Sequence, residues 1–271
     1  MGELVILSLI LSLMVALFWL KRFRKLDKYE KEPERLIYLT FFAGALATAP
    51  SLLFEFPLHM NYRGSSSLGD LFLSFLWVGI VEEFFKYLAV RLTVYRSKDF
   101  NELMDGMIYM ISAALGFATM ENVGYMLGLG LFVGLFRTVI SYLAHVSFSA
   151  ILGYYLAKSK IEAQRGWLWV GFGLAIAFHW LYDAFLVGGN VKRSGTFLSV
   201  SVILWVFGLV LTFILAKKAQ ALSPFRTVHL LPRGLTRPCQ ACGKTVSTKA
   251  WICHHCGEPL ELEEEEVTLK A

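Results

Sequence analysis

The chain has 271 residues, of which 56% are hydrophobic and 17% charged, whereas soluble domains have about 45–50% and about 25%. This balance excludes an ordinary soluble globular domain and favours a polytopic membrane protein. The net charge of +5 comes from short basic clusters between apolar runs, so it indicates membrane topology, and no nucleic-acid partner is expected.

Seven apolar segments are long enough, or nearly so, to cross about 30 Å of hydrocarbon as helices. They are residues 4–20, 36–55, 70–90, 107–127, 131–156, 167–187 and 197–216. All are expected to be helical because a backbone exposed to lipid must form its hydrogen bonds within its own segment. The predicted fold is therefore an all-α polytopic membrane domain of about seven transmembrane helices, covering residues 1–218, with a small C-terminal module.

Basic residues gather in alternate connections between these segments. Thirteen lie in residues 21–35, 91–98 and 158–165, and only three lie in the connections of the opposite side. The positive-inside rule then predicts an integral membrane protein with its N-terminus outside and its C-terminus in the cytosol.

The third segment contains GIVEEFFKYLAV, residues 79–90, in which Glu82, Glu83 and Lys86 interrupt an apolar run. A charge at the bilayer centre costs about 2.5–3.5 kcal/mol on insertion scales, so such groups face a cavity or a partner. Glu82 and Lys86 are four residues apart and can pair on one helix face, whereas Glu83 is rotated by about 100°. The three groups are either a structural ion pair or part of a functional site.

Further ionisable groups lie in the next three segments. They are Glu121 in the fourth, His145 in the fifth, and His179 and Asp183 in the sixth. A rise of about 1.5 Å per residue places Glu82 and both histidines near mid-depth, and the other two acids nearer the outer side. Acids and imidazoles in four successive segments favour one shared pocket over separate helix contacts.

Peptide hydrolysis fits this set of residues. It needs a base that activates water, an acid for the leaving amine and a group that stabilises the oxyanion. Glu82 is the predicted base, Glu83 shapes or shares that role, and Lys86 tunes the pair. The two histidines bind the oxyanion or a catalytic Zn²⁺, with Glu121 and Asp183 as further ligands or as groups that orient them. A proton-coupled transporter or channel would use the same groups as a relay, although no internal repeat supports it.

The C-terminal part has a different composition. Residues 219–238 contain three prolines and are predicted to be a linker, and residues 261–271 form an acidic tail. Residues 239–260 hold two CxxC pairs, each followed by glycine, and four thiolates suit tetrahedral Zn²⁺. We predict a structural zinc ribbon that docks a cytosolic partner; its ligands are Cys239, Cys242, Cys253 and Cys256. A membrane scaffold whose working part is this ribbon is a third interpretation of the chain.

Three motifs resemble those of a known family. EExxK at residues 82–86, FxxxEN at 117–122 and HxxxD at 179–183 are similar to the motifs of the PrsW family of intramembrane proteases. This family is part of a wider superfamily that includes the CAAX-type prenyl endopeptidases. The resemblance covers roughly residues 30–190. Tyr87 stands where CAAX-type relatives carry an arginine, which favours the PrsW branch.

The resemblance implies an endopeptidase that cuts peptide bonds in or near a prokaryotic cell membrane. It implies Glu82 and Glu83 as the catalytic pair. The family's best-known substrates are membrane-anchored anti-sigma factors, so the implied partner is a membrane-anchored protein. Both metal-dependent and glutamate-dependent catalysis are compatible with these residues. Four further residues complete the implied site: Glu121, His145, His179 and Asp183.

Overall fold

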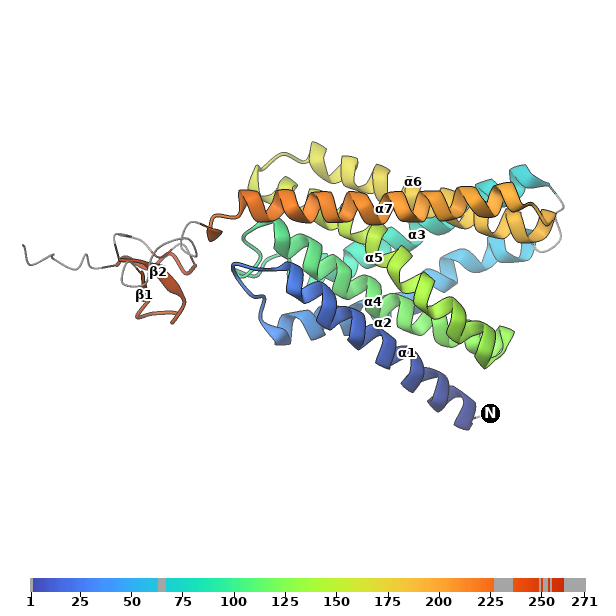
Figure 1. Ribbon diagram of the computed structural model, residues 1–271, viewed down its shortest axis with the longest axis horizontal. Coiled ribbons are helices and arrows are strands. Elements are labelled where there is room, and N and C mark those ends of the chain that lie inside the picture. Colours follow the sequence, from blue (N-terminus) through green and yellow to red (C-terminus); the bar gives the residue numbers. More distant parts are fainter. Residues whose placement is uncertain are drawn as a thin grey trace, which may run out of the picture.

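The computed structural model describes residues 2–62, 67–226, 236–248, 250, 253 and 255–260. Seven α-helices follow one another in these residues: α1 (Gly2–Phe23), α2 (Glu34–Tyr62), α3 (Leu68–Thr93), α4 (Leu103–Leu129), α5 (Leu131–Ile161), α6 (Gly166–Lys192) and α7 (Gly195–Leu222). A short 3-10 turn, η1 (Arg24–Leu26), follows α1, and β1 (Thr236–Pro238) pairs antiparallel with β2 (Thr245–Ser247). The prediction of an all-α membrane domain with a small C-terminal module is confirmed (Figure 1).

The boundaries between the parts of the chain stay predictions. Helix α7 continues to Leu222, four residues beyond the predicted end of the membrane domain at residue 218. Residues 227–235 of the predicted linker and the acidic tail at 261–271 lie outside the described residues.

Six of the seven described helices are long and apolar enough to cross a membrane. Helix α3 is of similar length but carries Glu82, Glu83 and Lys86 in its apolar stretch, and these groups keep it out of that set. Three neighbours shield it in part, because α3 packs against α2, α4 and α6. Helix α3 therefore turns its charged groups toward the bundle and keeps an exposed apolar face, which includes Leu73, Phe84 and Leu92.

Helix α4 is the centre of the bundle: it packs most extensively against α5, α2 and α1, and it also contacts α3 and α7. Small residues allow this close packing. A Cβ added at Gly116 would lie 1.9 Å from the Phe41 carbonyl oxygen, and one at Gly106 would lie 2.3 Å from the Gly153 carbonyl oxygen. Any larger residue at these two positions would force α4 away from α2 or α5.

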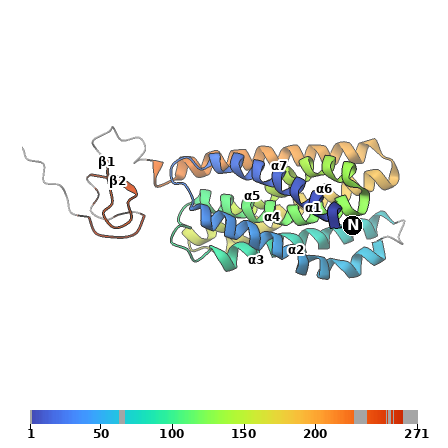
Figure 2. The same cartoon turned by 90° about the horizontal axis from the view of Figure 1, so that it is seen from below.

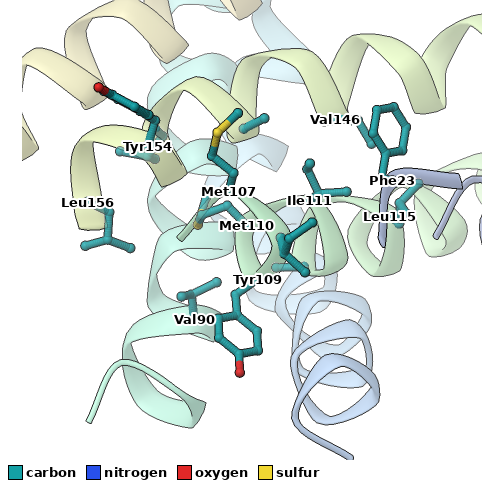
Figure 3. Close-up of a cluster of buried hydrophobic side chains, with 14 of the residues drawn as sticks. Phe23, Val90, Met107, Tyr109, Met110, Ile111, Leu115, Val146, Tyr154 and Leu156 are labelled. Atoms are coloured by element: carbon teal, nitrogen blue, oxygen red, sulfur yellow. The ribbon is translucent and has the colours of Figure 1, made fainter. Parts of the chain in front are cut away.

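The main hydrophobic cluster surrounds α4 (Figure 3). Met107, Met110 and Ile111 of α4 lie among side chains of α1, α3 and α5, which include Phe23 and Val146. Polar side chains add bonds between helices, since Ser12 Oγ lies 3.0 Å from the Thr119 carbonyl oxygen and 2.7 Å from the Tyr142 hydroxyl.

The three basic connections meet at one end of the bundle. Lys160, at the end of α5, donates to the carbonyls of Tyr95 and Phe100 in the α3–α4 connection, at 2.7 Å each. Gln220, near the end of α7, donates to the Leu26 carbonyl before α2 at 2.6 Å. The opposite end holds the start of α1 (Figure 2). We call the end with the basic connections the basic end.

The cysteine module, defined here as the described residues of 236–260, consists of two similar loops. In the first, the Gly243 amide donates to the Cys239 carbonyl at 2.8 Å; in the second, the Gly257 amide donates to the Cys253 carbonyl at 2.7 Å. Both glycines have positive φ, 73° and 77°, a backbone region that favours glycine. Each CxxCG sequence therefore folds into the same tight turn and points its two sulfurs inward.

Candidate active site

The ionisable groups of α3, α5 and α6 converge in the middle of the bundle. Glu82 Oε2 lies 3.6 Å from His145 Nδ1 and 3.6 Å from His179 Nε2. Each of these three residues lies near the midpoint of its helix. All three are at most 5% exposed. The helices thus bring together the base candidate and both histidines that the sequence singled out.

Lys86 pairs with both glutamates from within the same helix. Its Nζ lies 2.9 Å from Glu82 Oε2, 2.9 Å from Glu83 Oε1 and 3.0 Å from His145 Nδ1. Lys86 and Glu83 are fully buried. The ring of Phe117 lies 4.6 Å from the ammonium and closes its remaining side. Three polar contacts and one aromatic face compensate a cation that has no access to water.

Glu83 differs from Glu82 in its surroundings. Its Oε1 accepts from Lys86 and lies 3.0 Å from His179 Nδ1, while its Oε2 accepts from the Ser149 hydroxyl at 2.8 Å. Both oxygens of Glu83 are therefore engaged with protein groups. Glu82 points instead to the gap between the two imidazoles.

Two carboxylates hold the imidazole rings from the other side. Glu121 Oε2 lies 2.7 Å from His145 Nε2, and Asp183 Oδ2 lies 3.2 Å from His179 Nε2. Glu121 is itself paired with Arg137 of α5 at 3.0 Å. All seven candidate residues of the sequence analysis are thus linked by direct contacts, although their catalytic roles stay predictions.

The positions of the protons follow from these contacts. His145 can donate its Nε2–H to Glu121, which leaves Nδ1 as the acceptor that faces Lys86 and Glu82. His179 has carboxylate oxygens at both ring nitrogens, Glu83 at Nδ1 and Asp183 at Nε2. This arrangement is stable when the ring carries both protons, or when a cation lies at Nε2.

One acid of the site was not predicted from the sequence. Glu55 of α2 is 4% exposed, accepts from Ser51 at 2.6 Å, and interacts electrostatically with Glu82, Glu121 and Lys86. It stands alone among apolar residues near the predicted end of the second segment, where a charged residue usually marks the end of a membrane span. Its isolation in an apolar run was the one signal that could have identified it.

The site carries an excess of negative charge. Five carboxyl groups interact there with two permanent cations, Lys86 and Arg137. Because the site is buried, extra protons or a divalent cation must compensate the excess of carboxylates over cations. Glu82, His145 and His179 form a group that could hold a metal ion, because one donor atom from each lies within 4.8 Å of the others.

The cysteine module contains a second such group. Its four sulfurs lie within 4.8 Å of one another, with Cys239 Sγ 3.8 Å from Cys256 Sγ and Cys242 Sγ 3.7 Å from Cys253 Sγ. A disulfide would need about 2.05 Å. The four cysteines are free thiols, and their grouping could hold a metal ion.

The fold and the site together define a class: a helical membrane protein with acids, imidazoles and a lysine assembled in the middle of its membrane-spanning bundle. The sequence model of the family described as PrsW family intramembrane metalloprotease matches residues 32–213. This range contains every candidate active-site residue and ends before the cysteine module. The chain belongs to the PrsW family, and it is an intramembrane protease of a prokaryotic membrane.

Proteins named Protease PrsW are similar over most of their length. That of Bacillus subtilis is 31% identical over 199 residues, which cover 72% of this chain and 87% of the relative. That of Clostridioides difficile is 34% identical over 187 residues, or 66% of this chain and 77% of the relative. No solved structure matches the chain. The family membership favours proteolysis over the transporter and scaffold interpretations.

Proposed function

We propose that Glu82 is the general base of the protease and that its substrates are membrane-anchored proteins, including proteins of the anti-sigma-factor type. The observation that carries the proposal is the position of Glu82 Oε2, 3.6 Å from an imidazole nitrogen on either side and 2.9 Å from Lys86. A water molecule that enters this gap meets an acceptor for its proton and two rings that can face a developing oxyanion.

Each neighbour of Glu82 then has a separate task. Glu83 fixes the orientation of His179 through Nδ1, and Lys86 donates to Glu82 and balances its charge. Glu121 fixes His145 through Nε2. After attack on the carbonyl carbon, Glu82 passes its proton to the leaving amine, and the C–N bond breaks.

A catalytic zinc ion fits the donor set. Donors at about 2.1 Å from a tetrahedral ion are about 3.4 Å apart, and Glu82 Oε2 lies 3.6 Å from both ring nitrogens. The residues that would hold the ion are Glu82, His145 and His179, and the net negative charge of the site favours it. Glu82 would be a ligand in this metal-dependent arrangement and the general base in the glutamate-dependent one. When bound, zinc polarises the carbonyl and lowers the pKa of bound water. Asp183 would then orient His179 or supply a further ligand.

A structural zinc ion also fits the cysteine module. Sulfurs at about 2.3 Å from a tetrahedral ion are about 3.8 Å apart, which agrees with the spacings of 3.7 Å and 3.8 Å. The basic end, which carries the module, would face the cytosol under the positive-inside rule, and the N-terminus would lie outside.

The test of the base is Glu82→Gln in full-length protein, assayed on a single-pass membrane substrate in proteoliposomes. We expect an unchanged helical circular dichroism spectrum and cleavage reduced at least about 10²-fold, the lower range for loss of a general base. Glu162→Gln, on the exposed connection after α5, is the matched control. Cleavage by purified Glu82→Gln at the rate of the control would refute the assignment.

The test of the catalytic metal separates the two metal groups. A full-length variant with all four cysteines replaced by serine should retain one zinc per chain by elemental analysis, and the added change His179→Ala should remove it. Metal-free protein that cleaves at the full rate would refute the metal-dependent mechanism and leave the glutamate-dependent one.

A further inference from the structure

The cysteine module contacts the membrane domain at a defined surface. Glu30, in the α1–α2 connection, is 4% exposed, and the residues that cover it come from the module. Lys244 forms an ion pair with Glu30 and lies 3.9 Å from Asp99 in the α3–α4 connection. His255 Nδ1 lies 2.8 Å from the same Glu30 oxygen. The module thus bridges two connections of the basic end.

The segment that leads from α7 to the module is part of the same contact. Phe225 is 2% exposed, and its ring stacks on that of His255 with centroids 4.6 Å apart and planes at 8°. Ser223, two residues earlier, lies beside Glu102 before α4 and interacts with its carboxylate. An apolar stack and an ion pair therefore hold the module from two sides.

Both contact residues are positioned by the loops that carry the cysteines. Lys244 follows the first loop directly, and its carbonyl accepts from the Cys239 amide at 2.9 Å. His255 lies within the second loop, between Cys253 and Cys256. They meet at Glu30 because the four sulfurs hold the two loops together, and small modules of this kind are generally unfolded without their metal.

The surface beneath the module is strongly acidic. Asp27, Glu32 and Glu102 are buried beside Glu30, and each has one carboxylate oxygen without a hydrogen bond in the described residues. Burial raises the pKa of Glu32 and of Glu102 to about 8. The Lys244 ammonium, which the module supplies, lowers the electrostatic free-energy cost of placing these carboxyl groups close together.

We propose that the metal-loaded cysteine module is an intramolecular cap, which docks on Glu30 and Asp99 through Lys244 and His255 and is released when its metal is lost. The surface on the membrane domain is the acidic face of the α1–α2 and α3–α4 connections, and its occupant is this chain's own module. The docked module ties together the ends of α2, α3 and α4. These helices carry four acids of the site and Lys86, so docking restrains the helices that form the active site.

The proposal rests on metal binding by the module, and its test measures metal and docking separately. Full-length protein in lipid nanodiscs is followed by hydrogen–deuterium exchange of residues 27–32, with zinc per chain determined on each sample. Loss of the Glu30 contact should raise exchange there roughly tenfold or more, as expected for a charge-assisted hydrogen bond.

The proposal predicts the zinc content and the protection of residues 27–32 in four variants and one control. Lys244→Ala should keep its zinc and lose the protection of residues 27–32, and Cys239→Ser with Cys242→Ser should lose one zinc and the same protection. Glu30→Lys should lose protection, and its combination with Lys244→Glu should restore it. Lys218→Glu, an exposed charge change on α7, should alter neither quantity.

Contrary results are equally specific. Protection that persists in the cysteine variant, or in Lys244→Ala, would overturn the docking. Loss of zinc in Lys244→Ala would also overturn it, because Lys244 would then serve the fold of the module. Absence of any zinc that depends on the cysteines would instead contradict the metal assignment under the proposed function.

Discussion

Replacing Lys86 tests most directly whether its ammonium compensates the buried charges of Glu82 and Glu83. The proposed change is Lys86→Met, which keeps an unbranched chain of similar length and removes the ammonium. Glu82 and Glu83 then each lose a donor at 2.9 Å. Two hydrogen bonds to charged groups are worth about 3–6 kcal/mol, and breaking a buried ion pair by removing one partner costs about 3–5 kcal/mol. We therefore expect the free energy of unfolding to fall by about 3–5 kcal/mol.

A second variant separates charge balance from packing. Lys86→Met combined with Glu82→Gln and Glu83→Gln removes the two uncompensated carboxylates along with the cation. Neutral replacements of buried ion pairs are often neutral or stabilising, so this variant should recover most of the loss. It should remain inactive because it lacks the proposed base.

The measurement is denaturant unfolding in mixed micelles, followed by far-UV circular dichroism. Lys218→Met, at an exposed position of α7, is the control and should change stability by less than about 0.5 kcal/mol. The reasoning is refuted if Lys86→Met costs less than about 1 kcal/mol, or if the triple variant is no more stable than Lys86→Met.

Three further predictions follow from the packing and the charges. Glu55→Gln should keep the fold, since Ser51 can donate to the amide oxygen, and should lower the rate of cleavage because it replaces an acid that interacts with Glu82 and Glu121; an unchanged rate would remove Glu55 from the site. Gly116→Ala should destabilise the bundle by about 1–3 kcal/mol, because its Cβ would overlap the carbonyl of a facing helix; unfolding midpoints check it. Burial raises the pKa of Glu102 from 4.5 to about 8, so the folded state binds this proton more tightly and stability falls as pH rises from 4.5 to 8. Glu102→Gln should therefore stabilise the protein at pH 8.5 and much less at pH 4.5, and equal effects at both would contradict the burial argument.

Much of this architecture could be predicted from the sequence because lipid leaves few alternatives for the backbone. Apolar runs of the right length must be helices, and a charge inside such a run must have a partner. Glu82, His145 and His179 were identifiable on that ground alone, and mid-helix positions brought them to the same depth. The structure adds their distances, which depend on how the helices pack.

Other features could not be predicted because they depend on tertiary placement. Glu55 lies on a helix whose contact with α3 leaves no periodic signal in the sequence. The pairing of Glu121 with Arg137 depends on the crossing of α4 and α5, and the sequence had placed Glu121 nearer the outer side. The contact of Lys244 with Glu30 joins residues that are far apart in the chain, and nothing in either motif encodes it.

Adjacent glutamates resolve a conflict between stability and reactivity in a buried site. A carboxylate that is to accept a proton from water must face the place where the water binds, yet a buried charge without partners is costly. A rotation of about 100° between neighbours lets one helix place two acids in different surroundings. Glu83 takes donors from Lys86, His179 and Ser149 and anchors the charge cluster. Glu82 shares the same lysine but faces the gap between the imidazoles, so one helix presents Glu83 to the charge cluster and Glu82 to both histidines.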